Sequence, residues 1–316
     1  MSCLLLNACT AEAGNPAQNV GAQESENLEE TTPATPETLA TEPATPAVDF
    51  KIVPEGMTIE TRFVCTDADW ERPYTDDYSK WLLNLKLFPD EHETTDYEGI
   101  TKPKSSKIYV GVVDMDLIGA FGKNGKERPA DLQQCADACM RLWAEYLWNN
   151  KMYEKIHFKN SGGSDFSYAK WAEGYRMHLA NNRVTWSKDA APDYSYTNFR
   201  KYMSTVFMYC GTLSMSRELK SVRWQDIKPG DMLIFGGSPG HVVTIMDVMR
   251  NKKTGELRAM FSQSYMPAQE TEILAYWNNN YSPWYDINID TYSTVETPQW
   301  YFELEHGSKF VRWADR

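Results

Sequence analysis

The run of residues 226–248, DIKPGDMLIFGGSPGHVVTIMDV, constrains the fold of this chain more than any other segment. Two apolar stretches, 232–235 and 242–248, are separated by glycine, serine and proline. This pattern predicts a β-hairpin. His241 opens the second strand, where sheet pairing would fix its backbone while its ring stays accessible. A general base needs such placement before it needs a suitable pKa, so His241 is the first candidate catalytic residue.

A candidate nucleophile lies upstream in residues 129–150, PADLQQCADACMRLWAEYLWNN, which predict a helix. Asp131 is the expected N-cap, with Gln134 completing a capping box. Cys135 would then lie in the first turn, where free N–H groups and the helix dipole favour a thiolate. The alternative is structural, because Cys135 and Cys139 recur at helical spacing and can both be small core residues. Cys139 is expected to be structural in either case.

Residues 257–270, LRAMFSQSYMPAQE, predict a strand that returns beside the histidine strand. On it, Gln263 is the leading candidate to orient the imidazole of His241, since its side-chain oxygen can accept from a ring N–H. The alternative is an ordinary polar strand residue. Gln134, directly before Cys135, is a candidate to bind an oxyanion beside the backbone N–H of the cysteine.

A competing motif lies in the same turn. Residues 236–240, GGSPG, satisfy the G-x-S-x-G pattern of serine hydrolases, which requires a helix after the serine. The residues that follow are apolar and β-branched, which is typical of a strand. Ser238 is therefore not expected to be a nucleophile.

The order Pro-Gly-Asp, apolar strand, turn, Gly-His-Val and apolar strand resembles the second half of papain-like cell-wall peptidases of the NlpC and CHAP groups. The pair Gln134-Cys135 matches the Gln-Cys pair of CHAP enzymes. The resemblance implies an α+β, papain-like fold: a helix bearing the nucleophile packs on an antiparallel sheet, with a helical insertion before His241. The usual Asp-Cys-Ser-Gly start of NlpC enzymes is absent, and Gln263 replaces the usual third group. A degenerate, ligand-binding version of the fold therefore stays open.

A wider resemblance covers residues 60–315. The runs DLQQCADA, EGYR (173–176), FRKYMSTVFMYCGTLS (199–214), GGSPGH and QSYMPAQ (263–269) resemble an uncharacterised family of bacterial lipoproteins with a domain of unknown function. This resemblance implies no activity.

The N-terminal residues predict an anchor and a tether. Residues 1–9, MSCLLLNAC, resemble a partial lipoprotein signal in which Cys9 would be lipidated. Residues 10–50 are acidic and rich in proline and threonine, a composition that predicts a disordered tether. Residues 1–50 hold eight of the 44 acids and none of the 32 bases, which leaves the remainder at a net charge of only −4. A nucleic-acid partner is therefore not expected.

Residues 51–316 are expected to form a single α+β domain. Helices are predicted at 76–88, 166–179 and 196–219, and strands at 107–117 and 153–158. Three residues near the second helix, Trp171, Tyr175 and Arg176, are expected to line the cleft. The chain has no cysteine or histidine cluster with zinc spacing and no nucleotide-binding glycine motif, so neither a metal nor a cofactor is expected.

The expected function is that of a cysteine-dependent amidase or peptidase. Cys135 would attack an amide after losing its proton to His241, and Gln263 would orient the imidazole. The resemblance and the tether imply a peptidoglycan or peptide substrate and a lipid-anchored place in the bacterial cell envelope. The alternative is a non-catalytic envelope lipoprotein that binds a peptide or glycan in a degenerate papain-like cleft.

Overall fold

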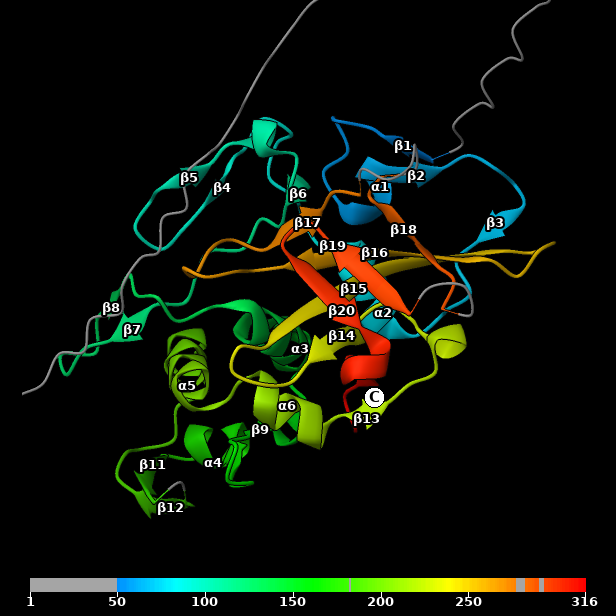
Figure 1. Cartoon of the computed structure of the whole chain (residues 1–316). Helices are drawn as coiled ribbons and strands as arrows, with labels where there is room; N and C mark the ends of the chain where they lie inside the picture. The colour runs from blue at the N-terminus through cyan, green and yellow to red at the C-terminus, as the bar shows by residue number, and fades with distance from the viewer. Residues whose placement is uncertain (1–49, 182, 277–281, 290–292) are drawn as a thin grey trace, which may run out of the picture. The chain divides into compact units, whose positions relative to one another are not determined.

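A computed structural model describes residues 50–181, 183–276, 282–289 and 293–316, which belong to one compact unit (Figure 1). The expectations for Cys9 and for the tether up to residue 49 lie outside these residues. No helix in the described part of the chain is long and apolar enough to cross a membrane.

The described residues contain six α-helices and a central antiparallel sheet (Figure 1). The helices are α1 (Ile59–Arg62), α2 (Asp77–Leu83), α3 (Cys135–Asn149), α4 (Tyr168–Ala172), α5 (Tyr196–Tyr209) and α6 (Thr212–Glu218). Short 3-10 turns are η1 (Lys104–Ser106), η2 (Tyr153–Lys155), η3 (Trp224–Asp226) and η4 (Leu304–His306). The architecture is thus a mixture of helices and antiparallel strands.

The central sheet contains the hairpin that the sequence predicted. Its main order is β13 (Lys220–Ser221), β21 (Lys309–Arg312), β14 (Met232–Phe235), β15 (His241–Asn251), β16 (Leu257–Gln263), β17 (Glu272–Leu274) and β6 (Tyr109–Val112). In addition, β18 (Trp284–Ile287) pairs with β16, and β3 (Trp70–Glu71) pairs with β15. All these neighbours are antiparallel, and Phe235 lies opposite His241 across the hairpin.

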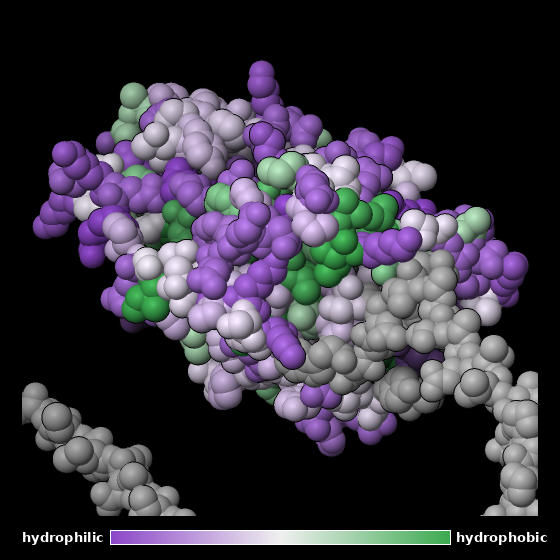
Figure 2. Space-filling view, turned by 90° about the horizontal axis from the view of Figure 1, so that it is seen from above, coloured by the Kyte–Doolittle hydropathy of each residue, from purple (hydrophilic) through white to green (hydrophobic). Residues whose placement is uncertain are grey.

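The described residues also form six two-stranded antiparallel sheets. They are β1 (Phe50–Ile52) with β2 (Phe63–Cys65), β4 (Thr94–Thr95) with β5 (Thr101–Lys102), β7 (Ala120–Phe121) with β8 (Glu127–Arg128), β9 (His157–Lys159) with β10 (Asp165–Ser167), β11 (Tyr175–Ala180) with β12 (Arg183–Lys188), and β19 (Thr294–Thr297) with β20 (Trp300–Glu303). The face seen from above in Figure 2 is largely hydrophilic, with a smaller hydrophobic area among the polar side chains.

The histidine strand β15 is apolar on both faces because both faces are covered. Val242 and Met246 belong to the apolar cluster on the side of α3. Val243 and Ile245 belong to a second cluster, which includes residues of β18 and of the β19–β20 hairpin. Burial on both faces explains the near-continuous apolar run in the sequence.

Helix α3 supplies the other wall of the core. Met140 and Leu147 on it are fully buried. Cys139 is 3% exposed, and its sulfur accepts a hydrogen bond of 3.0 Å from the Thr244 hydroxyl on β15. Cys139 is therefore buried in the core, as expected of a structural cysteine.

An ion pair between Asp231 and Arg312 fixes the start of the hairpin. Gly230 has a φ of +86°, a conformation that favours glycine, and the fully buried Asp231 follows it. Its carboxylate accepts two hydrogen bonds of 2.7 Å from the Arg312 guanidinium. This pairing ties the beginning of β14 to the C-terminal strand β21.

Two predicted helices are interrupted in the structure. Residues 166–179 are not one helix, because α4 ends at Ala172 and strand β11 starts at Tyr175. Between them Gly174 has a φ of +92°, and a Cβ there would lie 2.0 Å from the Ala190 carbonyl oxygen. The predicted helix 196–219 is two helices, α5 and α6, separated by residues 210–211.

The remaining predicted elements are shorter than expected. Helix α2 occupies seven residues of the predicted 76–88, and β6 four residues of 107–117. The segment 153–158 begins as the 3-10 turn η2, and the strand β9 starts only at His157.

Candidate active site

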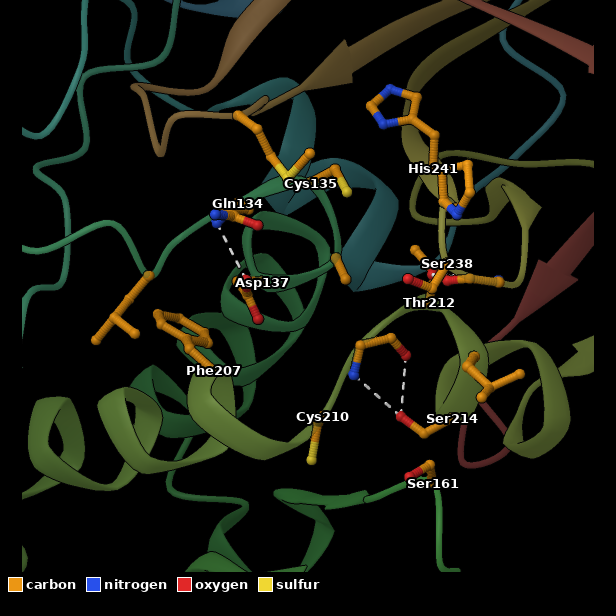
Figure 3. A pocket seen from close by; sticks show the side chains of 18 of the residues that line it. Gln134, Cys135, Asp137, Ser161, Phe207, Cys210, Thr212, Ser214, Ser238 and His241 are labelled. Atoms are coloured by element: carbon orange, nitrogen blue, oxygen red, sulfur yellow. Dashed lines mark hydrogen bonds between the residues drawn. The ribbon is translucent and has the colours of Figure 1, made fainter. Parts of the chain in front are cut away.

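Cys135 and His241 line the same cavity, which has a volume of about 500 Å³ (Figure 3). Three segments that are distant in sequence form most of its wall: the start of α3, the junction of α5 and α6, and the turn between β14 and β15. The Thr212 hydroxyl donates to the Gly237 carbonyl oxygen at 3.1 Å, which joins the last two segments. In Figure 3 the His241 imidazole extends from its strand toward the side on which Cys135 lies.

Cys135 is the first residue of α3, and its N-cap is Gln134 rather than Asp131. The predicted N-cap was wrong because the chain turns once more before the helix starts. The Asp131 carboxylate instead accepts from the Gln134 side-chain amide at 2.9 Å and from the Ala268 N–H at 2.7 Å. The Gln134 N–H donates to Asp137 at 3.0 Å, which closes the helix start.

The thiol of Cys135 does not have the lowered pKa that its position in the first helical turn predicted. Burial and the nearby Asp137 carboxyl raise the pKa of Cys135 to about 11, although the backbone N–H groups of Ala136 and Val242 interact with the sulfur and favour the thiolate. Desolvation therefore outweighs the helix start. The contact with the Val242 N–H places the sulfur beside the residue that follows His241.

His241 is 2% exposed, so the expectation of an accessible ring was wrong. Its imidazole is packed among aromatic side chains, with the ring centroids of Tyr265, Trp300 and Phe302 at 5.3, 5.4 and 5.8 Å. Burial lowers the pKa of His241 to about 4. The imidazole is therefore neutral at physiological pH.

Gln263 lies where the sequence placed it, at the end of the strand that returns beside β15. Its Oε1 lies 2.9 Å from the Nε2 of His241, and the side chain is 1% exposed. The structure therefore brings Gln263 into contact with His241, and it places His241 on the same cavity wall as Cys135.

Gln134 also lines the cavity and is half-buried. Its side-chain Nε2 donates to Asp131, which holds the amide beside the start of α3. One N–H of that amide is engaged in this bond, and a primary amide has a second.

Asp137 is a cavity residue that the sequence reasoning missed. It is 6% exposed, and burial raises its pKa well above the usual carboxyl range. Its position three residues after the N-cap is the signal that marks an acid of a capping box, and a correct N-cap would have found it. Its proximity contributes to the raised pKa of Cys135.

The residues predicted to line the cleft lie elsewhere. Trp171, Tyr175 and Arg176 are not among the residues that line the cavity of Cys135 and His241. The Arg176 guanidinium stacks 4.5 Å over the Trp171 ring and donates to the Trp171 carbonyl oxygen at 2.9 Å. The prediction was wrong because Gly174 ends α4 and turns the chain into β11, so the three residues do not share a helix face.

Ser238 lies in the turn between β14 and β15 and lines the cavity. A strand follows it, as predicted, and the requirement of a serine-hydrolase elbow is not met. In the part of the chain that the structure describes, no group of three histidine, cysteine or acidic side chains is arranged to hold a metal ion. Cys135, Cys139 and Cys210 are free thiols.

No curated protein and no solved structure matches the chain significantly. The family described as a domain of unknown function, DUF4846, matches residues 59–308, which include α3, the whole cavity wall and every strand of the central sheet except β21. The chain therefore belongs to the DUF4846 family.

Proposed function

We propose that this domain is a cysteine-dependent amidase or peptidase in which Cys135 is the nucleophile, His241 the general base and Gln263 the residue that orients the imidazole. The observation that carries the proposal is the 2.9 Å contact between His241 Nε2 and Gln263 Oε1, beside a cavity that also contains Cys135. A nucleophile, a base and a third group that orients the base form the general arrangement of a covalent hydrolase.

The resting site would hold a neutral thiol and a neutral imidazole. Burial keeps the pKa of Cys135 at about 11 and that of His241 at about 4, so an ion pair is not the ground state. Proton transfer from sulfur to the imidazole would accompany attack on the substrate carbonyl. General-base catalysis does not require a preformed thiolate.

The reaction would proceed in two halves. The Cys135 sulfur forms a bond to the amide carbon, and the carbonyl electron pair moves onto oxygen. Collapse of this intermediate breaks the C–N bond, and the departing amine takes the proton from His241. Water, deprotonated by the same imidazole, then hydrolyses the thioester to a carboxylic acid and regenerates the thiol.

The start of α3 would stabilise the negative oxygen of both intermediates. The backbone N–H of Cys135 is at the first position of the helix, where no intrahelical acceptor exists. The second N–H of the Gln134 amide would be the other donor. Both groups lie on the wall that carries the nucleophile.

The wall composition supports a peptide substrate. The residues that line the cavity include the acid Asp131 and neither lysine nor arginine. Such a wall disfavours polyanionic ligands. At its rim are four partly exposed apolar side chains, Met208, Tyr209, Leu213 and Met266.

A peptidoglycan stem peptide or cross-link is the substrate that the resemblance to NlpC and CHAP enzymes favours. Acylated Cys9 and the acidic tether would place the domain in the bacterial cell envelope. The test of this location is membrane partitioning of the natively expressed protein, compared with that of its Cys9→Ala variant. Equal partitioning of the two proteins would contradict a lipid anchor.

The hydrolase proposal is tested by incubating purified peptidoglycan with the domain and identifying released fragments by mass spectrometry. The wild-type domain should release peptides, and Cys135→Ala and His241→Ala should not. Ser238→Ala is the matched control, because it changes the same cavity wall and should keep most of the activity. Loss of activity in the serine variant with retention in Cys135→Ala would refute the proposal.

A binding function is the second candidate, and the raised pKa of Cys135 favours it, because a buried neutral thiol is a poor nucleophile. In that case wild-type protein and Cys135→Ala would bind peptidoglycan fragments equally, and neither would release products. Cosedimentation with insoluble peptidoglycan measures the binding.

A further inference from the structure

The orientation of the Gln263 side chain is determined by groups on the side away from His241. Its Nε2 donates to Glu272 Oε1 at 3.0 Å and to Gln299 Oε1 at 2.6 Å. A carboxylate paired with a lysine can only accept hydrogen bonds, so the amide nitrogen must face Glu272. The oxygen of the same amide then faces the imidazole.

Glu272 is itself rigidly held. It is fully buried at the start of β17, and the Lys102 ammonium lies 3.0 and 3.1 Å from its two carboxylate oxygens. The Thr94 hydroxyl donates to it at 3.2 Å. Lys102 and Thr94 belong to the β4–β5 hairpin, so a buried carboxylate has both a counter-charge and a second donor.

The three polar residues form a row across three neighbouring strands. His241 lies on β15, Gln263 on β16 and Glu272 on β17, and Gln263 lies directly opposite Glu272 in the β16–β17 register. The row is buried at every member. Hydrogen bonds of 2.9 and 3.0 Å connect its members in sequence.

We propose that Glu272 is a positioning residue that, through Gln263, keeps the proton of the neutral imidazole on Nε2 of His241 and leaves Nδ1 free. Because Gln263 Oε1 can only accept, the ring nitrogen 2.9 Å from it must donate. The unprotonated Nδ1 is then the atom that would accept the proton of Cys135. This last step rests on the proposed function, whereas the assignment of the tautomer does not.

The tautomer is measured by long-range ¹H–¹⁵N correlation spectra of the domain labelled with ¹⁵N-histidine, in the absence of substrate. In wild-type protein at pH 7, His241 should show a protonated Nε2 and an unprotonated Nδ1. In Glu272→Gln the new amide can donate as well as accept, so Gln263 can turn over and the Nε2 signal should shift toward that of a tautomer mixture. His241→Ala assigns the resonance.

Glu270→Gln is the matched control, because Glu270 lies two residues away and contacts His92 and Thr95 rather than Gln263. It should leave the His241 signals unchanged. If Glu272→Gln unfolds because Lys102 loses its partner, Glu272→Gln combined with Lys102→Met leaves no unpaired charge and should give the same mixture. A wild-type proton on Nδ1, or an unaltered tautomer in a folded Glu272 variant, would overturn the proposal.

An activity measurement separates this inference from the proposed function. Glu272→Gln should lower kcat roughly tenfold with little change in KM, as expected when the base loses its preferred tautomer. A tautomer shift in a domain that hydrolyses nothing would support the positioning role and contradict the hydrolase. Full kcat despite a tautomer mixture would leave the positioning role standing and contradict the step in which Nδ1 accepts the proton of Cys135.

Discussion

Two histidines of this domain, His241 on β15 and His157 on β9, have pKa values that their surroundings shift in opposite directions. His241 is buried among aromatic rings with one amide partner, and its pKa is lowered to about 4. His157 is one-third exposed between two carboxylates, Asp165 at 3.1 Å and Asp315 at 3.0 Å, and its pKa is raised to about 9. Burial without a counter-charge favours the neutral imidazole, whereas two neighbouring carboxylates favour the protonated imidazolium.

The largest expected difference between the two histidines is in catalysis. If the proposed hydrolase function holds, His241→Ala should lower kcat/KM by roughly 10³-fold, the typical contribution of a general base. His157→Ala should keep activity within about twofold of wild type, because His157 is not among the cavity residues. Rates on the fragments identified from peptidoglycan give the comparison, and equal losses in both variants would indicate a common effect on folding instead.

The neutrality of His241 also predicts how Cys135 reacts. With a pKa near 11 instead of the ordinary 9, Cys135 should react with iodoacetamide about 100-fold more slowly at pH 7 than an ordinary thiol, with a rate that rises about tenfold per pH unit. His241→Ala should leave this rate nearly unchanged, because no imidazolium supports the thiolate. Mass-spectrometric mapping of labelled peptides separates Cys135 from the buried Cys139 and Cys210. Fast labelling at pH 7 that slows in His241→Ala would show an ion pair.

The pH dependence of activity is the third test. A base with a pKa of about 4 stays deprotonated at pH 5.5, where a histidine with the ordinary value of 6.5 would be about nine-tenths protonated. The hydrolase should therefore keep most of its kcat/KM at pH 5.5, roughly tenfold more than an exposed histidine base would allow. An acidic limb centred near pH 6.5 would contradict the buried, neutral state of His241.

The smallest expected effect is on stability, where the two histidines act in opposite pH windows. Because the folded pKa of His157 is above 6.5, its contribution is complete below pH 6.5 and is lost as pH rises through about 9. Discounted for solvent screening, it should be about 1 kcal/mol. His157→Gln should remove this pH dependence of the free energy of unfolding, measured with urea.

The contribution of His241 to stability has the opposite pH dependence. The pKa of His241 in the folded domain lies below 6.5. Between pH 6.5 and about 4, His241 is therefore protonated in the unfolded chain and neutral in the folded domain. Stability should fall as the pH is lowered through that range, and His241→Ala should flatten this decline. A decline of the same size in the variant would assign it to other groups.

The site could be predicted from the sequence where it depends on local patterns. The apolar strands and the turn between them placed His241, and the return strand placed Gln263 beside it. The predicted helix start identified Cys135 as the candidate nucleophile. These features need only the strand period and helix start signals within short segments. The expectation that Cys135 and His241 lie together came from the resemblance to papain-like peptidases, which supplied the long-range pairing.

The failures concern effects that short segments do not encode. The pKa of Cys135 depends on burial by distant elements, which no helix position reveals. Glu272 was missed because its partners, Lys102 and Gln263, come from other strands. The two interrupted helices are a different kind of failure, which the sequence could have prevented. Gly174 and Gly211 are visible in it, and each lies two residues after the last residue of a helix.

The row of His241, Gln263 and Glu272 runs across the strands rather than along one, and this affects how the site should be recognised in other proteins. The partners are 22 and nine residues apart in this chain, but those intervals only count the residues in the intervening loops and strands. Insertions into the turn at 252–255 would change the interval and leave the register intact. A search pattern for this site should therefore fix the strand pairing of the three residues and leave their spacing free.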